Sequence, residues 1–401
     1  MEILVIFGGL ALIGLVIFGL QIWAVRAAVK TEEQEESDSN EVFPPISVLK
    51  PLKGLEDNLF NNLASFCIQD YSEYEIICSL QDMNDPAYKV AQKVRERFPE
   101  RRIVILVERR TDGLNPKVNN LSAAYGKAQH PTILISDSNV MVHPGYLKRI
   151  GHFMGDKKVG LVTNLIRGVG ARTIGSMFEN LHLNSFILGN VCFLNKLVGI
   201  PCVIGKSMLM RKEDLEAIGG LKAFKDVLAE DHLIGEKIRK RGQKVIVSSD
   251  LIDNVNEYWD LKKFLNRHVR WGKMRWKLLG FKYVLELLIN PVLFACVPIL
   301  FYGFSHESLL LALCVGLMKG MGDLYLGQLI GAQLNPWLYV LSPFKDLLMG
   351  FVWFIPFVSD TVTWRGNRYL IGTDTLLSHC PSAGVWALKY RVAEGIRARI
   401  A

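Results

Sequence analysis

YEIICSLQD (residues 74–82) is the stretch of sequence that decides the fold, because an apolar, strand-like pattern ends there abruptly in polar residues. An amphipathic stretch, PAYKVAQKVRERF (residues 86–98), follows it directly. The same alternation of strand-like and helix-like stretches continues on both sides, in ISVLKPL (46–52), LEDNLFNNLASFCIQ (55–69), RIVILVE (102–108), VNNLSAAYGKAQ (118–129) and TILISDS (132–138). Near-continuous apolar strands separated by amphipathic helices predict an α/β domain with a parallel sheet.

Polar residues stand where three of these strands end, namely Lys50, Asp82 and Asp137. Ligands of parallel α/β sheets bind outside the carboxyl ends of the strands, so we expect the three side chains to face one cleft. Neither GxGxxG nor GxxxxGKS follows the first strand, which carries KPLKG (residues 50–54) instead. A phosphorylated ligand would therefore be held by a metal on a carboxylate and by basic side chains.

Two of the aspartates each allow a structural and a functional interpretation. Asp82 could form a turn, but Asp85 with Pro86 can cap the next helix, which leaves Asp82 free to bind a uracil imide or a ribose hydroxyl. Asp137 could also be a turn residue, or it could bind Mg²⁺ or Mn²⁺, which prefer oxygen ligands. Asn139, two residues on, would be a weaker, neutral ligand.

A third carboxylate and a lysine complete the candidate site. Asp231 falls in the first turn of an amphipathic helix that begins near Glu230, where negative charge is favourable whatever the function. In a cleft the same carboxylate could act as a general base on an attacking hydroxyl. Lys117, in the polar loop DGLNPKVNNL (112–121), could meet a phosphate.

The chain begins with an uncharged apolar run, residues 3–25, which is long enough to span a bilayer. Arg26 and Lys30 follow it, which is the reverse of a cleaved signal peptide. We therefore expect an uncleaved anchor, with the domain that follows it in the cytoplasm.

A second apolar block contains two candidate spans, residues 285–304 and 309–330, joined by the short turn SHES. This pattern predicts a helical hairpin, in which Lys319 and Asp323 pair on one helix face away from lipid. Residues 337–358 either span the bilayer or lie in its interface; we favour an interfacial or re-entrant helix, because an even number of spans keeps the basic tail in the cytoplasm. The stretch 181–203 is either an interfacial helix or a buried core helix.

The resulting division has an anchor (1–26), an acidic linker (27–43), an α/β domain (44–280), membrane helices (281–360) and a basic cytoplasmic tail with WRGNRY (361–401). The net charge of +8 suits an anionic partner, and without an arginine-rich arm or an RNA-binding aromatic motif we expect no nucleic acid. Seven scattered cysteines, none in a CxxC pair, indicate buried residues in a reducing compartment.

RHVRW (residues 267–271) places cationic and aromatic residues just before the second apolar block. It is either a positive-inside anchor with an interfacial tryptophan or an anion site at the membrane. Together with SLQDMNDPA, GLNPKVNNL, LISDS, LMRKEDLEAIGG and LAEDHL, in this order, it makes the chain resemble the ceramide glucosyltransferases and related GT-A glycosyltransferases. That family is marked by three separated aspartates and a (Q/R)xxRW motif.

The resemblance implies a GT-A (Rossmann-like) catalytic domain between transmembrane helices. It implies inverting transfer of glucose from UDP-glucose to the primary hydroxyl of ceramide, with Mg²⁺ or Mn²⁺. The implied roles are nucleotide-sugar binding by Asp82, Lys117, Asp137, Arg267, Arg270 and Trp271, metal binding by Asp137, and general-base catalysis by Asp231.

Three alternatives remain open at this point. The acceptor could be a hopanoid or diacylglycerol, for example with N-acetylglucosamine as the sugar. A polysaccharide synthase would need more membrane spans, and a non-enzymatic scaffold would not need the aspartates. A bacterial inner membrane is favoured over a Golgi membrane.

Overall fold

The computed structural model describes residues 1–32 and 43–380. Its centre is an eight-stranded sheet in the order β3-β2-β1-β4-β7-β6-β8-β5. The strands are β1 (Ile46–Pro51), β2 (Tyr74–Leu80), β3 (Ile103–Val107), β4 (Thr132–Ser136), β5 (Val140–Met141), β6 (Val159–Val169), β7 (Ser207–Arg211) and β8 (Lys244–Val255). The predicted alternation of strands and helices, and with it the α/β class of the domain, is confirmed.

The sheet is mixed rather than wholly parallel. β3, β2, β1 and β4 are parallel as predicted, but β7 runs antiparallel to both β4 and β6. The long connection from β6 to β7 therefore begins and ends at the same end of the sheet. One consequence is that Ser136, at the carboxyl end of β4, pairs with Ser207, at the start of β7.

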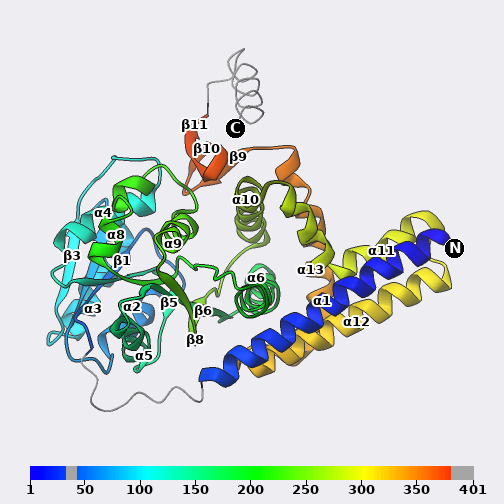
Figure 1. The fold of residues 1–401 in the computed structure, drawn as a ribbon, viewed down its shortest axis with the longest axis horizontal. Coiled ribbons are helices and arrows are strands. Elements are labelled where there is room, and N and C mark those ends of the chain that lie inside the picture. The colour runs from blue at the N-terminus through cyan, green and yellow to red at the C-terminus, as the bar shows by residue number, and fades with distance from the viewer. Residues whose placement is uncertain (33–42, 381–401) are drawn as a thin grey trace.

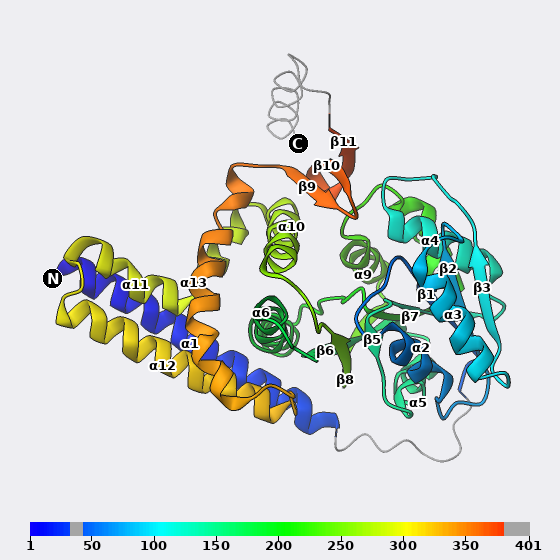
Figure 2. The same ribbon diagram turned by 180° about the vertical axis from the view of Figure 1, so that it is seen from behind.

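Helices cover both faces of the sheet, as Figures 1 and 2 show from opposite sides. One face packs on α2 (Leu59–Cys67), α3 (Pro86–Arg97) and α5 (Tyr146–His152). The other packs on α4 (Pro116–Lys127), α8 (Lys212–Glu216) and α9 (Glu230–Lys240). These faces form two separate apolar cores, because the side chains of each strand alternate between them.

A long helical run lies between the sheet and the membrane helices (Figure 1). It comprises α6 (Ile174–His182), a π-helical turn (Leu183–Ile187), α7 (Leu188–Phe193) and a second π-helical turn (Leu194–Val198). Leu188, Val191 and Cys192 are buried against the first helix of the chain. Of the two possibilities for residues 181–203, a core helix is therefore the better description up to Phe193, after which exposed apolar residues follow.

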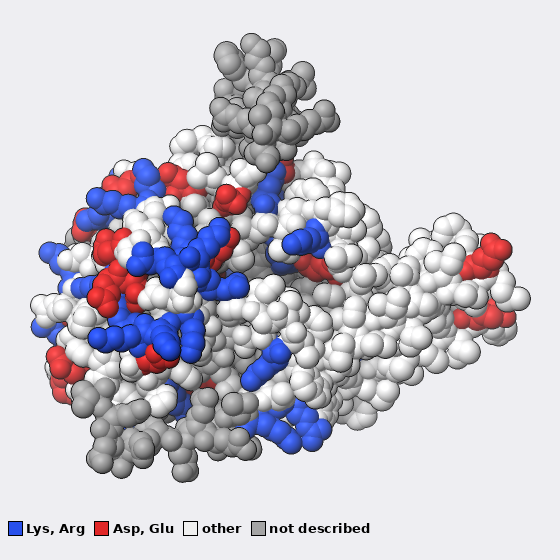
Figure 3. All heavy atoms as spheres, viewed as in Figure 1, with Lys and Arg blue, Asp and Glu red and all other residues white. Residues whose placement is uncertain are grey.

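The membrane part consists of α1 (Glu2–Glu32), α10 (Leu261–Leu279) with a 3₁₀ segment (Gly280–Ile289), α11 (Pro291–Tyr302), α12 (His306–Leu329), a 3₁₀ turn (Pro336–Leu341) and α13 (Ser342–Val352). Among the described residues, three segments are long and apolar enough to cross a membrane, namely Glu2–Lys30, His306–Leu329 and Pro336–Phe357. The bent pair Leu261–Ile289 and Pro291–Tyr302 would be a fourth if it forms one span. Figure 3 shows that the helices projecting from the domain carry Asp and Glu at their far tip and an uncharged belt behind it.

The predicted hairpin exists, but its first arm is short. α11 has 12 residues, and at 1.5 Å per residue it is roughly 18 Å long, less than the hydrocarbon thickness of a bilayer. The chain bends by 75° between Ile289 and Pro291, where α11 begins. The predicted pair in the second arm is confirmed, with 2.6 Å between Lys319 Nζ and Asp323 Oδ1.

The chain returns to the catalytic domain after the membrane helices. A three-stranded antiparallel sheet, β9 (Thr361–Trp364), β10 (Asn367–Ile371) and β11 (Leu377–His379), packs Val362, Tyr369 and Ile371 against Leu228. WRGNRY thus forms the hairpin between β9 and β10. We had expected this segment to lie in the tail. The basic residues Lys389, Arg391, Arg397 and Arg399 lie outside the described residues. The remaining short 3₁₀ turns are Phe153–Gly155, Leu221–Phe224, Ile355–Phe357 and Thr373–Thr375.

Candidate active site

Asp137 lies at the carboxyl end of β4, beside the start of β7. Because Ser136 pairs with Ser207, the residues next to them, Asp137 and Lys206, come together. Lys206 Nζ is 3.3 Å from Asp137 Oδ2 and donates to Asn139 Oδ1 at 2.8 Å. The ammonium group of Lys206 therefore stands between the two side chains that the sequence offers as metal ligands.

Lys117 reaches the other oxygen of the same carboxylate. It is in the first turn of α4, which Asn115 caps and Pro116 begins. Its Nζ lies 3.0 Å from Asp137 Oδ1 and 3.0 Å from Glu230 Oε1, and it donates to the Gly205 carbonyl at 2.9 Å. The structure thus gathers Lys117, Asp137, Lys206 and Glu230 into one cluster at the sheet edge.

Mutual pairing keeps the cluster charged. Burial favours the neutral form of Asp137, but the neighbouring ammonium groups of Lys117 and Lys206 outweigh burial and hold the pKa of this carboxyl below its usual range. Burial lowers the pKa of Lys206 to about 8, and Asp137 limits the fall. Burial would also lower the pKa of Lys117, but Asp137 and Glu230 raise it above its ordinary value. The expected phosphate ligand Lys117 is therefore a full cation.

Asp231 opens α9 next to this cluster. Its Oδ2 accepts from the Gly205 backbone N–H at 2.9 Å and its Oδ1 from the His232 N–H at 2.8 Å. A Cβ atom added to Gly205 would lie 2.6 Å from Asp231 Oδ2, so only glycine lets the backbone approach this carboxylate. Lys117 contacts the carbonyl of the same glycine, which joins Asp231 to the Asp137 cluster.

Asp82 is exposed at the end of β2, and its Oδ1 accepts from the Asn84 N–H at 2.9 Å. The prediction that Asp85 caps the next helix is confirmed, because its side chain accepts from the Ala87 N–H. β1 lies between β2 and β4, so the strand ends that carry Asp82 and Asp137 are separated by roughly 10 Å.

Lys50 does not face the cleft, contrary to the expectation from its place at a strand end. Its side chain is fully buried, donates to Ser136 Oγ at 3.1 Å and to the Asp137 carbonyl at 2.7 Å, and lies over the Phe66 ring. Burial lowers the pKa of Lys50 to about 7. Lys50 therefore stabilises the end of β4 by hydrogen bonds from the interior of the domain.

The two arginines of RHVRW have different surroundings. Arg267 Nη1 is 2.8 Å from Glu179 Oε1, and its guanidinium lies over the rings of Trp259 and Trp271. His268 Nε2 is 2.8 Å from Glu179 Oε2. Glu179 is fully buried, and its carboxylate neutralises the charge of Arg267, the first arginine of the motif.

Arg270 is differently placed. It is half-buried and lies over the ring of Trp364 in β9, 5.8 Å from its centroid, and among the described residues it has no ion-pair partner. The small C-terminal sheet therefore meets the RHVRW motif at Arg270. Of the two arginines, this one has a charge that remains available to an anionic ligand.

Glu179, Lys206, Glu230 and Trp364 are site residues that sequence reasoning missed. Glu179 is 89 positions from His268, and no spacing rule connects them. Lys206 lies in GKSMLMRK, where a lysine before a strand is ordinary. Antiparallel pairing of β7 with β4 is what brings Lys206 to Asp137, and the sequence analysis expected a parallel sheet.

The oxygens at the end of β4 suit a hard cation in kind, because Asp137 and Asn139 offer a carboxylate and an amide oxygen. Among the described residues no group of three His, Cys, Asp or Glu side chains could hold a metal ion. A metal there would need further ligands from a diphosphate, and it would meet the ammonium group of Lys206. The residues present thus fit a cation that arrives with its ligand.

The model of glycosyl transferase family 21 matches residues 6–377. Ceramide glucosyltransferase 1 of Caenorhabditis elegans is 28% identical over 345 residues, which cover 82% of this chain and 72% of the relative. The ceramide glucosyltransferase of Gibberella zeae is 26% identical over 307 residues, covering 58% of each chain.

Among solved structures, a mannosyltransferase of Pyrobaculum calidifontis, in complex with GDP-Man and Mn²⁺, superposes with a TM-score of 0.46 and 16% identity. The superposition covers 87% of this chain and 98% of the mannosyltransferase chain. TarS of S. aureus (residues 1–349), in complex with UDP-GlcNAc, gives a TM-score of 0.37 and 16% identity over 81% of this chain and 96% of that one.

Proposed function

Because the chain belongs to glycosyl transferase family 21, we propose that it transfers glucose from UDP-glucose to the primary hydroxyl of ceramide with inversion. Family membership confirms the predicted resemblance and the predicted enzyme class. The choice of sugar and acceptor is supported by the ceramide glucosyltransferases of worm and fungus that the chain resembles over most or more than half of its length.

One observation carries the proposal: the Asp231 carboxylate lies beside the Lys117–Asp137–Lys206 cluster, and Gly205 contacts both. A general base placed next to an anion-binding cluster suits displacement of a diphosphate by a hydroxyl. In the proposed reaction Asp231 takes the proton of the acceptor hydroxyl as its oxygen attacks the sugar. UDP leaves on the opposite face, and its negative charge is met by Lys117, Lys206 and Arg270.

We assign the nucleotide to the edge between Asp82 and Asp137. Asp82, exposed and free of helix capping, would accept from the uracil imide or a ribose hydroxyl. The separation of roughly 10 Å between the two strand ends suits a nucleoside whose diphosphate reaches the cluster. Asp137, with Asn139, would hold Mg²⁺ or Mn²⁺, which supplies further positive charge to the diphosphate when bound.

The membrane helices support a lipid acceptor. α10 carries Arg267 and Arg270 and continues through a bent segment into α11, so the catalytic motif and the membrane part are one continuous piece of chain. We place the catalytic domain on the cytoplasmic side, because Arg26 and Lys30 follow the first span. A bacterial inner membrane is the compartment we propose.

Purified protein in mixed micelles with Mg²⁺ or Mn²⁺ tests the function. UDP-glucose, UDP-galactose and UDP-N-acetylglucosamine are each supplied with ceramide, diacylglycerol or a hopanoid. The proposal predicts glucosylceramide as the main product and loss of transfer, with UDP binding kept, in Asp231→Asn. A different product would contradict the proposed sugar or acceptor while leaving the proposed mechanism in place. Full turnover by Asp231→Asn would show that this residue is not the base.

A further inference from the structure

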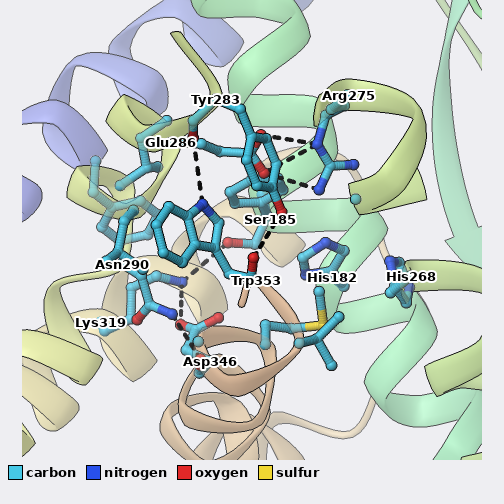
Figure 4. A pocket seen from close by; sticks show the side chains of 18 of the residues that line it. His182, Ser185, His268, Arg275, Tyr283, Glu286, Asn290, Lys319, Asp346 and Trp353 are labelled. Carbon is cyan, nitrogen blue, oxygen red and sulfur yellow. Dashed lines mark hydrogen bonds and ion pairs between the residues drawn. The ribbon is translucent and has the colours of Figure 1, made fainter. Parts of the chain in front are cut away.

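A cavity lies between the RHVRW motif and the membrane helices, apart from the Asp137 cluster (Figure 4). The cavity has a volume of about 40 Å³, enough for a small polar group, and its walls come from α1, α6, the π-helical turn Leu183–Ile187, α10, the following 3₁₀ segment, α12 and α13. We call it the His182 pocket. Several of these walls belong to the segments apolar enough to cross a membrane.

The charges in the walls of the His182 pocket neutralise one another. Arg275 forms a bidentate ion pair with Glu286, with its Nε 2.8 Å from Oε2 and its Nη2 2.8 Å from Oε1. Lys319 Nζ lies 3.1 Å from Asp346 Oδ2. Two cations and two anions therefore line the cavity, and an ionised headgroup would find no free counter-charge there. The pocket suits an uncharged ligand.

One polar side chain in the pocket lacks partners. His182 is 1% exposed, and neither of its ring nitrogens has a hydrogen-bond partner. Burial, with the nearby cations, holds the pKa of His182 well below its usual range, so the ring is neutral and offers one donor and one acceptor. Leaving such groups unpaired in a buried site is energetically unfavourable. A ligand with a hydroxyl or amide group would satisfy them.

The remaining surface of the pocket is apolar. Phe18, Phe186, Leu287, Met349 and Val352 contribute to it. Phe186 stacks on the His182 ring at 4.7 Å, which leaves the ring edge, with its two nitrogens, for polar contacts. The π-helical turn that carries Ser185 and Phe186 begins directly after His182, and such turns often occur at functional sites. The lining thus fits an amphiphile whose polar part is small and neutral.

The pocket is directly connected to the catalytic motif. The His182 ring meets the ring of His268 edge-on at 4.4 Å, and His268 shares the Glu179 carboxylate with Arg267. We propose that the His182 pocket binds the amide and secondary hydroxyl of a neutral lipid acceptor, with His182 as its hydrogen-bonding partner. This inference rests on the proposed function, since it assigns the recognition of the acceptor next to its reacting hydroxyl.

The test compares His182→Phe and His182→Gln with the wild type, as full-length protein in mixed micelles. His182→Phe keeps an aromatic ring without hydrogen bonds, and we expect the KM for short-chain ceramide, as mole fraction, to rise about tenfold, the effect of roughly one hydrogen bond. The KM for UDP-glucose should stay unchanged. His182→Gln should recover part of the loss. His306→Gln, exposed at the start of α12, is the matched control.

The ligand supplies the second half of the test. An alkyl alcohol of matched chain length lacks the amide and the second hydroxyl, so the wild type should use it poorly, and His182→Phe should use it no worse. An equal loss with ceramide and alkyl alcohol, or an unchanged KM for ceramide, would overturn the inference. Phosphatidylglycerol should not compete with ceramide, and competition would contradict the assignment of a neutral ligand.

Failure of the proposed function is distinguishable from failure of this inference. Binding of short-chain ceramide to the full-length protein is measured separately by equilibrium titration, with thermal unfolding as the check that the variants are folded. His182-dependent binding without any transfer would contradict the function and support the pocket. Transfer to ceramide with binding that does not depend on His182 would support the function and contradict the pocket.

Discussion

Arg267 and Arg270 belong to one motif, yet the structure predicts opposite consequences for their removal. Arg267→Met leaves the fully buried Glu179 with His268 as its remaining partner. Breaking a buried ion pair by removing one partner costs roughly 3–5 kcal/mol, because the remaining charge is left uncompensated. Arg270→Met leaves no buried carboxylate unpaired, so we expect a stability loss of about 1–2 kcal/mol, the range of a partly desolvated cation–π contact.

Ligand affinity should show the reverse order. A charged hydrogen bond to a phosphate is worth roughly 1.5–3 kcal/mol, so Arg270→Met should raise the Kd for UDP by roughly ten- to a hundredfold. The free energy of unfolding is measured by denaturant titration of purified full-length protein in micelles, and UDP binding by calorimetry. If Arg267→Met is as stable as the wild type, or if Arg270→Met binds UDP normally, the assignment of the two roles is refuted.

A double variant sharpens the argument. In Arg267→Met with Glu179→Gln the buried carboxylate is no longer charged, and the amide can still hydrogen-bond to His268 through a change of tautomer, because His268 Nδ1 has no partner. The double variant should therefore be less destabilised than the two single changes together, by roughly 1–3 kcal/mol. Additive losses would show that Glu179 and Arg267 do not stabilise each other.

Three further outcomes follow from the Asp137 cluster and from its neighbours Gly205 and Asp82. Lys206→Met should lower the apparent Kd for Mn²⁺ about tenfold, measured by metal titration of UDP binding, because an ammonium group no longer competes at Asp137 and Asn139; weaker metal binding would contradict competition. Gly205→Ala should lower kcat by roughly a hundredfold, because its Cβ would displace Asp231, whereas Gly126→Ala, with open space around it, should keep kcat. Asp82→Asn should raise the Kd for UDP about tenfold, because a charged hydrogen-bond acceptor is lost. Asp156→Asn, at an exposed position, is the control, and equal Kd values for Asp82→Asn and the wild type would contradict the prediction.

How far the sequence determines this site can be judged from individual residues. Strand ends and helix starts were predictable, because they depend on local periodicity and capping; Asp137, Asp231 and Asp85 all stand where the pattern places them. Lys206 and Glu179 were not, because their partners come from pairings between distant segments. The strands around WRGNRY were not predictable for a related reason. They are short, and their apolar side chains pack against Leu228, which is distant in the sequence.

The RHVRW motif links the His182 pocket to the proposed diphosphate site through one buried carboxylate. Arg267 and His268 divide the oxygens of one buried carboxylate, Glu179, so neither ring nor guanidinium can move without disturbing the other. His268 borders the His182 pocket, while Trp271, which packs over Arg267, also contacts the core of the catalytic domain. A lipid headgroup at His182 and a diphosphate at Arg270 would thus bear on one rigid helix from two sides.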